Sequence, residues 1–321
     1  MQKILIIQTA FLGDVILATP VATELKRLFP NSSIDFLVRK GNESLLENHP
    51  AISQIKIFDK KNGKLKSLKA LISEFRKTRY DLVINLHRFG SSGIITALSG
   101  AKIKYGFRKN PFSFAYSKSF EHSIDNGQHE VERNLSIIKE FGANKIVKPS
   151  LYPTLEQFDK VNQFKSNEYY CFAPASVWFT KQLPKEKWVE LLELYSEKGT
   201  LYLLGGKDDF QLCEEIKNKI NSSTEIENLA GKLNLLESAA LIKDAKRTFV
   251  NDSGPMHIAS AMNAPVTTFF CSTIPNFGFG PLSEDAKIVE VSNLTCRPCG
   301  LHGHKACPEG HFQCGNKIKL S

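Results

Sequence analysis

The chain lacks any apolar run near the roughly 20 residues that a membrane-spanning helix needs. Its N-terminus, MQKILIIQTAFLGD, also lacks the order of a signal peptide, because the apolar run ends in Gly-Asp rather than in a cleavage site. No short-period repeat or low-complexity segment is present. These absences predict a cytoplasmic globular protein without a membrane-spanning segment.

Two common nucleotide-binding patterns are also missing. No GxGxxG follows the first predicted strand, which argues against a dehydrogenase. The stretch Gly205-Gly206-Lys207-Asp208-Asp209 follows a predicted strand, but it is not a Walker A loop, because Asp208 stands where Ser or Thr is needed. No nucleic-acid motif is present either, so nucleic acid is not an expected partner.

The length of the chain and its excess of basic residues are informative. Its 321 residues suit two domains, and 42% hydrophobic with 23% charged residues is typical of a soluble globular protein. Lys and Arg number 42 against 33 Asp and Glu, and this excess of 9 favours anionic partners such as phosphorylated sugars or an anionic membrane surface. The basic residues are denser at 56–69 and 102–109. A solvated basic surface is the simpler alternative.

Apolar runs alternate with helical patterns along the first half of the chain. The expected strands are 3–8, 34–38, 54–58, 81–86 and 103–106, and the expected helices are 15–29, 42–48, 65–78, 91–98 and 130–141. Residues 9–14 are expected to form the first turn. Pro20 either kinks the first helix or, with Thr19, marks a second helix start.

The alternation weakens at 148–167, the best candidate for a linker, although 155–164 has a helical pattern. It then resumes, with expected strands 169–173, 200–204, 226–229, 247–251, 266–270 and 288–291, and helices 185–198, 208–220, 235–244 and one opening after 251. Such alternation indicates an α/β protein with parallel sheets. We expect two Rossmann-like domains, 1–155 and 156–321, whose sheets face each other across a cleft.

The most informative stretch is 249–281, which reads as strand, tight turn, helix start and strand. Asp252, Ser253, Gly254 and His257 gather where the strand ends, and open α/β sheets bind ligands there. A helix N-terminus also offers free N–H groups to a phosphate. Asp252 and His257 are therefore predicted to contact one ligand, the alternative being a purely structural histidine.

Three further turns carry candidate residues. Gly13 allows a sharp turn before Asp14, whose carboxylate either takes a proton from a sugar hydroxyl or only caps the helix. Lys181 either neutralises a diphosphate leaving group or is an exposed loop lysine. Asp208 or Asp209 either accepts from ribose hydroxyls or caps its helix.

These motifs resemble those of the ADP-heptose:lipopolysaccharide heptosyltransferases, glycosyltransferase family 9. Residues 8–20 (QTAFLGDVILATP) are similar to the family's N-terminal signature, and residues 251–259 (NDSGPMHIA) to its donor-site signature. Residues 129–135 (HEVERNL) and 178–184 also fit, in the right order. The resemblance covers nearly the whole chain and is closer to the second heptosyltransferase type.

The resemblance implies a GT-B fold, with the acceptor bound by the first domain and the nucleotide-sugar by the second. It implies inverting transfer of a heptose from ADP-heptose to the lipopolysaccharide inner core, with no obligatory cofactor. On this analogy Asp14 is the general base and Gly13 lies on the acceptor side. Lys181, also counted as catalytic, contacts the donor's phosphates with Thr180 nearby. The diphosphate and sugar are held by Asp252, Ser253, Gly254 and His257. Asp209 joins the donor-binding candidates because of its own turn after a strand, not because of the analogy. The basic excess then suits a phosphorylated glycolipid acceptor at the inner face of the inner membrane.

The tail holds four clustered cysteines, Cys296, Cys299, Cys307 and Cys314, with histidines between them. These are zinc ligand types, but spacings of two, seven and six residues match no standard zinc pattern. Zinc binding, disulfide pairing and packed free thiols all stay open. No catalytic metal is expected.

Rival functions use the same residues. A donor or acceptor other than heptose is the nearest, because residues 252–257 specify diphosphate binding better than sugar identity. A sugar-nucleotide epimerase of the same fold is another. A non-catalytic module, in which the tail binds zinc and a partner, is the rival from a different class.

Overall fold

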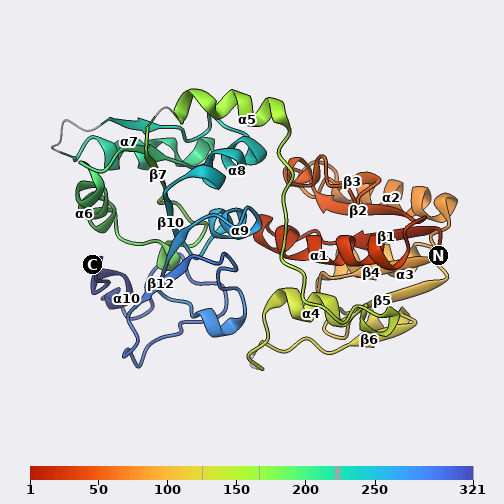
Figure 1. Ribbon diagram of the computed structural model, residues 1–321. Coiled ribbons are helices and arrows are strands. Elements are labelled where there is room, and N and C mark those ends of the chain that lie inside the picture. Colours follow the sequence, from red (N-terminus) through yellow and green to blue (C-terminus); the bar gives the residue numbers. More distant parts are fainter. Residues whose placement is uncertain (125, 166, 221–224, 321) are drawn as a thin grey trace. The chain divides into compact units, whose positions relative to one another are not determined.

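The computed structural model describes residues 1–124, 126–165, 167–220 and 225–320. The chain divides into two compact units, Met1–Tyr152 (unit 1) and Pro153–Ser321 (unit 2). Each unit is a sheet flanked by helices (Figure 1). Within the described ranges, no helix combines the length and the apolar character that crossing a membrane requires.

Unit 1 contains a six-stranded sheet in the order β3-β2-β1-β4-β5-β6, parallel throughout. Its strands are β1 (Lys3–Ile7), β2 (Ser33–Arg39), β3 (Gln54–Phe58), β4 (Leu82–Asn85), β5 (Ile103–Phe107) and β6 (Lys118–Phe120). Its helices are α1 (Leu12–Leu28), α2 (Lys64–Thr78), α3 (Gly90–Leu98) and α4 (Glu130–Ser136).

The apolar run of β1 is continuous because helices cover both faces of the sheet. Leu5 and Ile7 pack with Phe75 of α2 and Ile95 of α3 in one core cluster. Helices α1 and α4 contact each other, and the Asn134 side chain donates to the carbonyl of Leu17 at 3.2 Å.

Unit 2 repeats the plan, with the parallel order β12-β11-β10-β7-β8-β9. Its strands are β7 (Tyr169–Ala173), β8 (Thr200–Leu203), β9 (Ile226–Asn228), β10 (Arg247–Asn251), β11 (Val266–Phe270) and β12 (Ala286–Glu290). Its helices are α5 (Leu155–Val161), α6 (Lys185–Tyr195), α7 (Phe210–Lys217), α8 (Leu235–Asp244), α9 (Gly254–Ala261) and α10 (Gln313–Asn316). The tail closes this unit's core, because Phe312, Cys314 and Ile318 pack with Trp188 and Phe269.

Strand order places a topological switch point in each unit. The chain leaves β1 toward β2 on one side and returns to β4 on the other, and β7 and β10 have the same relation. Ligands of open α/β sheets bind outside the carboxyl ends of the strands at such points. The segments after β1 and β4, and those after β7 and β10, are therefore where each unit's site should lie.

The first helix differs from the expectation. It begins at Leu12 rather than at residue 15, so Gly13 and Asp14 belong to its first turn. It also runs straight through Pro20, which removes the N–H that would bond the carbonyl of Ile16. The Thr19 hydroxyl donates to that carbonyl at 2.8 Å instead, so the acceptor is satisfied and the helix continues.

Other departures are local. The expected helix 42–48 is a 3-10 turn, Glu43–Leu46, and the expected helix 130–141 ends at Ser136, with a 3-10 turn at Lys139–Phe141. Helix α7 likewise begins at Phe210, after a 3-10 turn. Strand β6 was not expected, because three residues, KSF, with no fully buried side chain carry little strand signal.

Candidate active site

An ion pair marks the switch point of unit 2. Lys181 lies in the 3-10 turn that follows β7, and its Nζ is 2.6 Å from Oδ2 of Asp252, the first residue after β10. Both side chains are largely buried, at 16% and 7% exposure. A charge so withdrawn from water needs a partner, and each of these side chains supplies the opposite charge to the other.

The loop after β11 adds a third group to this pair. The Thr273 hydroxyl donates to Oδ2 of Asp252 at 2.6 Å. Next to it, the Ser272 hydroxyl lies 3.0 Å from the hydroxyl of Thr180, and the Ser272 N–H donates to the Thr180 carbonyl at 3.2 Å. Three loops of unit 2 are thus hydrogen-bonded around one carboxylate and one ammonium.

Asn251, the last residue of β10, ties the first two of these loops together. Its Oδ1 accepts from the Leu183 N–H at 2.8 Å, and its Nδ2 donates to the Pro174 carbonyl at 2.7 Å. The next residues start α9, with Ser253 as an extended N-cap and Gly254 as the first helical residue. His257 lies one turn into α9 and is 6% exposed. The helix N-terminus therefore opens beside Asp252.

Asp209 lies elsewhere at the same sheet edge, after β8. Its Oδ2 accepts from the Gly206 N–H at 2.7 Å, which is a helix-capping contact. The structure does not bond Asp209 to Lys181 or Asp252. One carboxylate oxygen of Asp209 therefore caps the turn, as the capping alternative expected.

Asp14 also makes a capping contact. Its Oδ2 accepts from the Phe11 N–H at 3.1 Å, in the first turn of α1. Burial nevertheless raises the pKa of Asp14 to about 6, and repulsion by Glu130 adds to the rise. The Phe11 N–H and the charge of Arg88 lower this pKa but do not outweigh burial. Asp14 therefore caps the helix and also binds a proton more tightly than an ordinary aspartate does.

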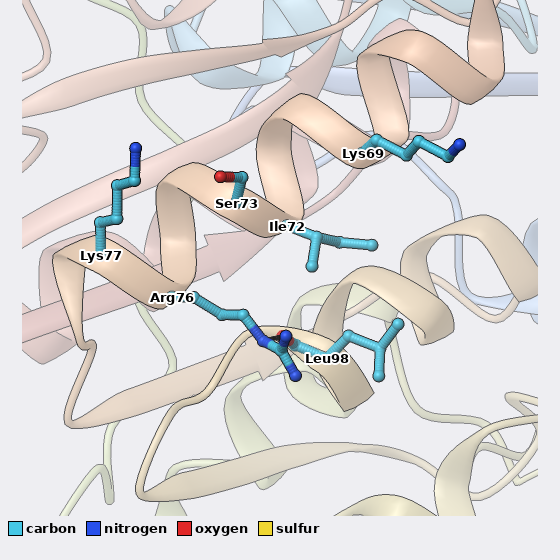
Figure 2. Close-up of a pocket in the computed structure, with 6 residues that line it drawn as sticks. All are labelled: Lys69, Ile72, Ser73, Arg76, Lys77 and Leu98. Carbon is cyan, nitrogen blue, oxygen red and sulfur yellow. Dashed lines mark hydrogen bonds between the residues drawn. The ribbon is translucent and has the colours of Figure 1, made fainter.

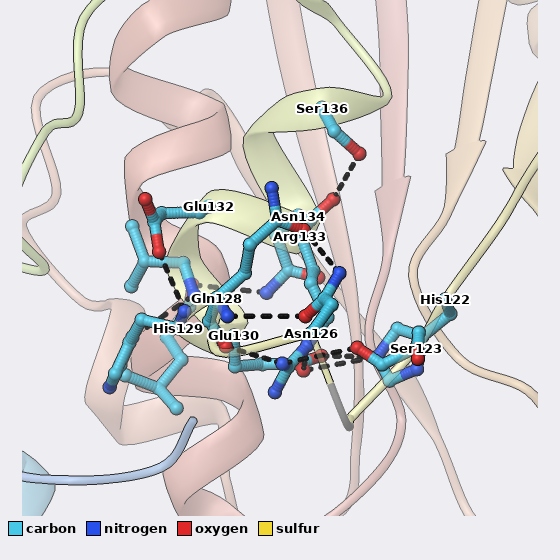
Figure 3. A network of polar contacts seen from close by, with 12 residues as sticks. His122, Ser123, Asn126, Gln128, His129, Glu130, Glu132, Arg133, Asn134 and Ser136 are labelled. Carbon is cyan, nitrogen blue, oxygen red and sulfur yellow. Dashed lines mark hydrogen bonds and ion pairs between the residues drawn. The ribbon is translucent and has the colours of Figure 1, made fainter. Parts of the chain in front are cut away.

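Glu130, which is itself buried, belongs to the polar network drawn in Figure 3. Its Oε2 is 3.0 Å from Nε2 of His122 and accepts from Nε of Arg133 at 2.7 Å. Burial opposes ionisation of Glu130, but these two partners outweigh it and hold its pKa below the usual range. Glu130 therefore keeps a fixed negative charge near Asp14.

Cations gather at the same edge of unit 1. Nζ of Lys60 donates to the Thr9 carbonyl at 2.6 Å, and the guanidinium of Arg39 lies 4.8 Å from the Phe11 ring centre. Burial and the charge of Arg39 lower the pKa of Lys60 to about 8. Burial, together with Lys60 and Arg88, lowers the pKa of His87 to about 3. The cations thus repel one another, an arrangement that an anionic ligand would relieve.

The tail cysteines are free thiols in the structure, and Cys314 is buried. Among the described residues, no three His, Cys, Asp or Glu side chains are arranged to hold a metal ion. None of these four sulfurs is bonded to another in the structure, and zinc binding, disulfide pairing and packed thiols stay predictions for the tail.

Sequence reasoning missed several residues of these sites. In unit 2 they are Thr273 and Arg297, and in unit 1 they are Arg39, Lys60, His87 and Arg88. Position alone could have found some of them, since Lys60 follows β3 and His87 follows β4 at the ligand-binding edge. Thr273 has the same signal, because it follows β11.

The comparisons with known proteins agree with this architecture. The chain is 29% identical over 285 residues to a lipopolysaccharide heptosyltransferase 3 from Escherichia coli, covering 82% of each chain. It is 26% identical over 318 residues to a lipooligosaccharide heptosyltransferase 2 from Haemophilus ducreyi, covering 90% of this chain and 89% of the relative. The solved E. coli ADP-heptose lipopolysaccharide heptosyltransferase II superposes with a TM-score of 0.81 at 21% identity, covering 98% of both chains.

Two parallel six-stranded sheets that align over nearly their whole length with that enzyme define the GT-B fold of glycosyltransferases. The family profile of glycosyltransferase family 9 (heptosyltransferase) matches residues 68–311, which is most of the chain. The chain belongs to this family and is a glycosyltransferase. The resemblance read from its motifs is confirmed.

Proposed function

We propose that the chain transfers a heptose from ADP-heptose to the inner core of lipopolysaccharide, with inversion at the anomeric carbon. The names of its relatives, lipopolysaccharide and lipooligosaccharide heptosyltransferases, support this substrate pair. The observation that carries the mechanism is Asp14, a carboxylate with a pKa of about 6 at the ligand-binding edge of unit 1.

The proposed reaction is a single displacement. The acceptor hydroxyl oxygen attacks the anomeric carbon, and the new C–O bond forms as the bond to the diphosphate oxygen breaks. Asp14 takes the hydroxyl proton, and ADP leaves with the electron pair of the broken bond. A base with a pKa of about 6 suits this step, because it is ionised at neutral pH yet more basic than an ordinary aspartate.

The proposal assigns the donor to unit 2. Lys181 contacts the diphosphate and offsets the charge that develops on the leaving ADP, while Asp252 holds the ammonium in place. Ser253, Gly254 and the N-terminus of α9 offer N–H donors to the same phosphates, and His257 contacts the sugar or diphosphate. Asp209 accepts from a ribose hydroxyl with the oxygen that does not cap its helix. No cofactor is required.

The acceptor is assigned to unit 1, with Gly13 and Asp14 beside its reactive hydroxyl. Arg39, Lys60 and Arg88 bind the acceptor's anionic groups. Burial is the main cause of the lowered pKa of Lys60, and the charge of Arg39 adds to it. A phosphate at this cluster would supply the opposite charge, which supports an anionic ligand.

A glycolipid acceptor also brings the protein to a membrane surface, and α2 suits that contact. The helix carries Lys64, Lys66, Lys69, Arg76 and Lys77 against a single acidic residue, Glu74. Figure 2 shows three of these cations around a shallow pocket with Ile72 and Leu98. Leu65 and Leu98 are 72% and 44% exposed. A basic, partly apolar helix of this kind binds anionic headgroups in the peripheral manner proposed here.

The test is transfer from a panel of nucleotide sugars to heptose-deficient lipopolysaccharide. We expect ADP-heptose to be used in preference to ADP-glucose and UDP-sugars, and NMR of the product to show the inverted anomeric configuration. Transfer of another sugar at a higher kcat/KM would replace heptose in the proposal. Interconversion of the free nucleotide sugar without an acceptor would identify an epimerase instead.

A further inference from the structure

The cysteine-bearing tail reaches the donor site through one arginine. The side chain of Arg297 is 4% exposed, so its charge must be matched by partners. Its Nε and Nη2 both donate to the Thr273 carbonyl, at 3.1 and 2.6 Å, and its Nη1 donates to the Val291 carbonyl at 3.0 Å. Nη2 also pairs with Glu290 at 2.5 Å.

Thr273 is therefore held from two directions. Its carbonyl accepts from Arg297, while its hydroxyl donates to Asp252 at 2.6 Å, the carboxylate that pairs with Lys181. Arg297 is thus connected to Lys181, the residue assigned to the diphosphate, through Thr273 and Asp252. We call this chain of contacts the relay. A shift of the Thr273 backbone would move its hydroxyl and leave Asp252 with one partner fewer.

A second bridge joins the tail to the turn that carries Lys181. The N–H of His304 donates to the Thr180 hydroxyl at 2.8 Å, and the Thr180 N–H donates to the His304 carbonyl at 3.1 Å. The Cys299 N–H also donates to the Ser272 carbonyl at 3.0 Å. The tail residues 296–304 thus bond both loops that place Lys181 and Thr273.

Arg247 shows what an arginine bridge looks like without this connection. Its Nη1 lies 3.2 Å from the Val266 carbonyl and 3.4 Å from the Thr267 hydroxyl, and its Nη2 pairs with Asp285 at 2.5 Å. Arg247 begins β10, so this bridge lies at the amino edge of the sheet, away from Asp252. Both arginines join a backbone carbonyl to a carboxylate, but only Arg297 contacts the loop that carries Thr273.

We infer that Arg297 is a positioning residue of the donor site, acting through Thr273 on the Asp252–Lys181 pair, and that tail residues 296–304 are part of that site. The inference rests on the proposed function only in taking Lys181 as the diphosphate contact. A lysine at 297 retains the charge for Glu290 but lacks the planar set of donors that meets two carbonyls and a carboxylate together.

The experiment is a double-mutant cycle in the full-length chain with Arg297→Lys, Thr273→Val and the combined variant, and Arg247→Lys as the matched control. We expect Arg297→Lys to lower kcat/KM for ADP-heptose by about 10- to 100-fold, the scale of a misplaced catalytic group. The combined variant should be no slower than the slower single variant, because both changes interrupt one relay. Arg247→Lys should leave kcat/KM within about twofold of wild type.

Amide hydrogen exchange of the ligand-free enzyme separates this inference from the proposed function. Arg297→Lys should speed exchange at residues 271–274 and Arg247→Lys should not. Losses in kcat/KM that multiply in the combined variant, or an unchanged kcat/KM for Arg297→Lys, would overturn the inference and leave the proposed function standing. If wild type does not use ADP-heptose while exchange still rises locally in Arg297→Lys, the proposed donor fails and the positioning of Thr273 stands.

Discussion

Asp14 of unit 1 and Asp252 of unit 2 occupy similar places in two sheets of the same strand order. Each follows the carboxyl end of a strand at the switch point, and each lies at the start of a helix. Asp252 has an ammonium 2.6 Å away and a hydroxyl donating to the same oxygen. Asp14 instead accepts from a backbone N–H, that of Phe11 at 3.1 Å, while Glu130 adds to the rise of its pKa. One carboxylate is neutralised by its partner and the other retains its affinity for a proton.

The charges beside each carboxylate determine which aspartate can act as a base. A carboxylate bound to an ammonium is a poor proton acceptor, because protonation would leave the cation without its counter-charge. Asp14 meets a smaller cost, since burial and Glu130, which favour its protonated form, outweigh the Phe11 N–H and Arg88. Topology therefore sets where the two sites lie, and the neighbouring charges set what each aspartate does.

The largest effect should come from removing the base in unit 1. Asp14→Asn retains an oxygen for the Phe11 N–H but cannot take a proton, so kcat should fall by roughly 10²- to 10⁴-fold. ADP binding, measured by calorimetry, should stay within about twofold of wild type, the scale of an ordinary surface change. Glu132→Gln is the matched control, because Glu132 makes the same kind of cap, accepting from the His129 N–H at 2.6 Å. Equal losses of ADP binding and turnover would reduce Asp14 to a structural cap.

The next largest effect should come from unit 2. Lys181→Met removes the charge assigned to the leaving diphosphate and should lower kcat by about 10²- to 10³-fold. It also leaves Asp252 buried without its cation, which should cost about 3 kcal/mol in the free energy of unfolding. Lys185→Met is the control, because its 2.8 Å ion pair with Glu215 is more exposed and should contribute less than about 1 kcal/mol. A stability loss no larger than that of the control would contradict the buried-pair interpretation.

Much of the fold could be predicted because its signals are local. Strands β3, β7, β10 and β11 begin and end at the expected residues, since each is a short apolar run ended by polar or turn residues. The start of α1 was misplaced because Phe11 is not a capping residue type and Asp14 supplies the capping oxygen from inside the helix. Strand β6 exists only through its pairing with β5, which no local pattern announces.

The sites were predictable where position at the sheet edge was enough. Lys181 and Asp252 were both expected at the donor site, and the strand order that places β7 beside β10 brings them together. Arg297 gave no such signal, because it lies in an irregular tail and acts through a backbone carbonyl. The effect of Glu130 on Asp14 was equally invisible, since it depends on α4 packing against α1.

Lysine replacements should weaken membrane binding more in unit 1 than in unit 2, and this effect should be smaller than the two above. Replacing Lys69 and Lys77 of α2 with Gln should weaken binding to phosphatidylglycerol vesicles by about 1 kcal/mol for each charge removed. The same change on α7 and just beyond it, Lys217→Gln with Lys219→Gln, is the matched control in unit 2 and should have little effect. Transfer to a deacylated, soluble acceptor should be unchanged in both double variants. Equal weakening by the two pairs would mean that net charge, rather than α2, governs vesicle binding.

The smallest effect should be a shift in the pH dependence of kcat when the pKa of Asp14 is changed. Because its pKa is raised to about 6, the base is lost as the pH falls through that value, and kcat should decline on the acidic side of about pH 6. Glu130→Gln removes the repulsion, while Arg88, Arg39 and the Phe11 N–H still favour the ionised carboxylate, so the acid limb should move to lower pH. The plateau rate should fall only a few-fold, because a less basic carboxylate is a weaker proton acceptor. Glu132→Gln should leave the limb in place. If the acid limb of kcat stays near pH 6 in Glu130→Gln, the raised pKa of Asp14 is due to burial alone. The difference between Asp14 and Asp252 would then rest on the Lys181 ion pair rather than on the network around Glu130.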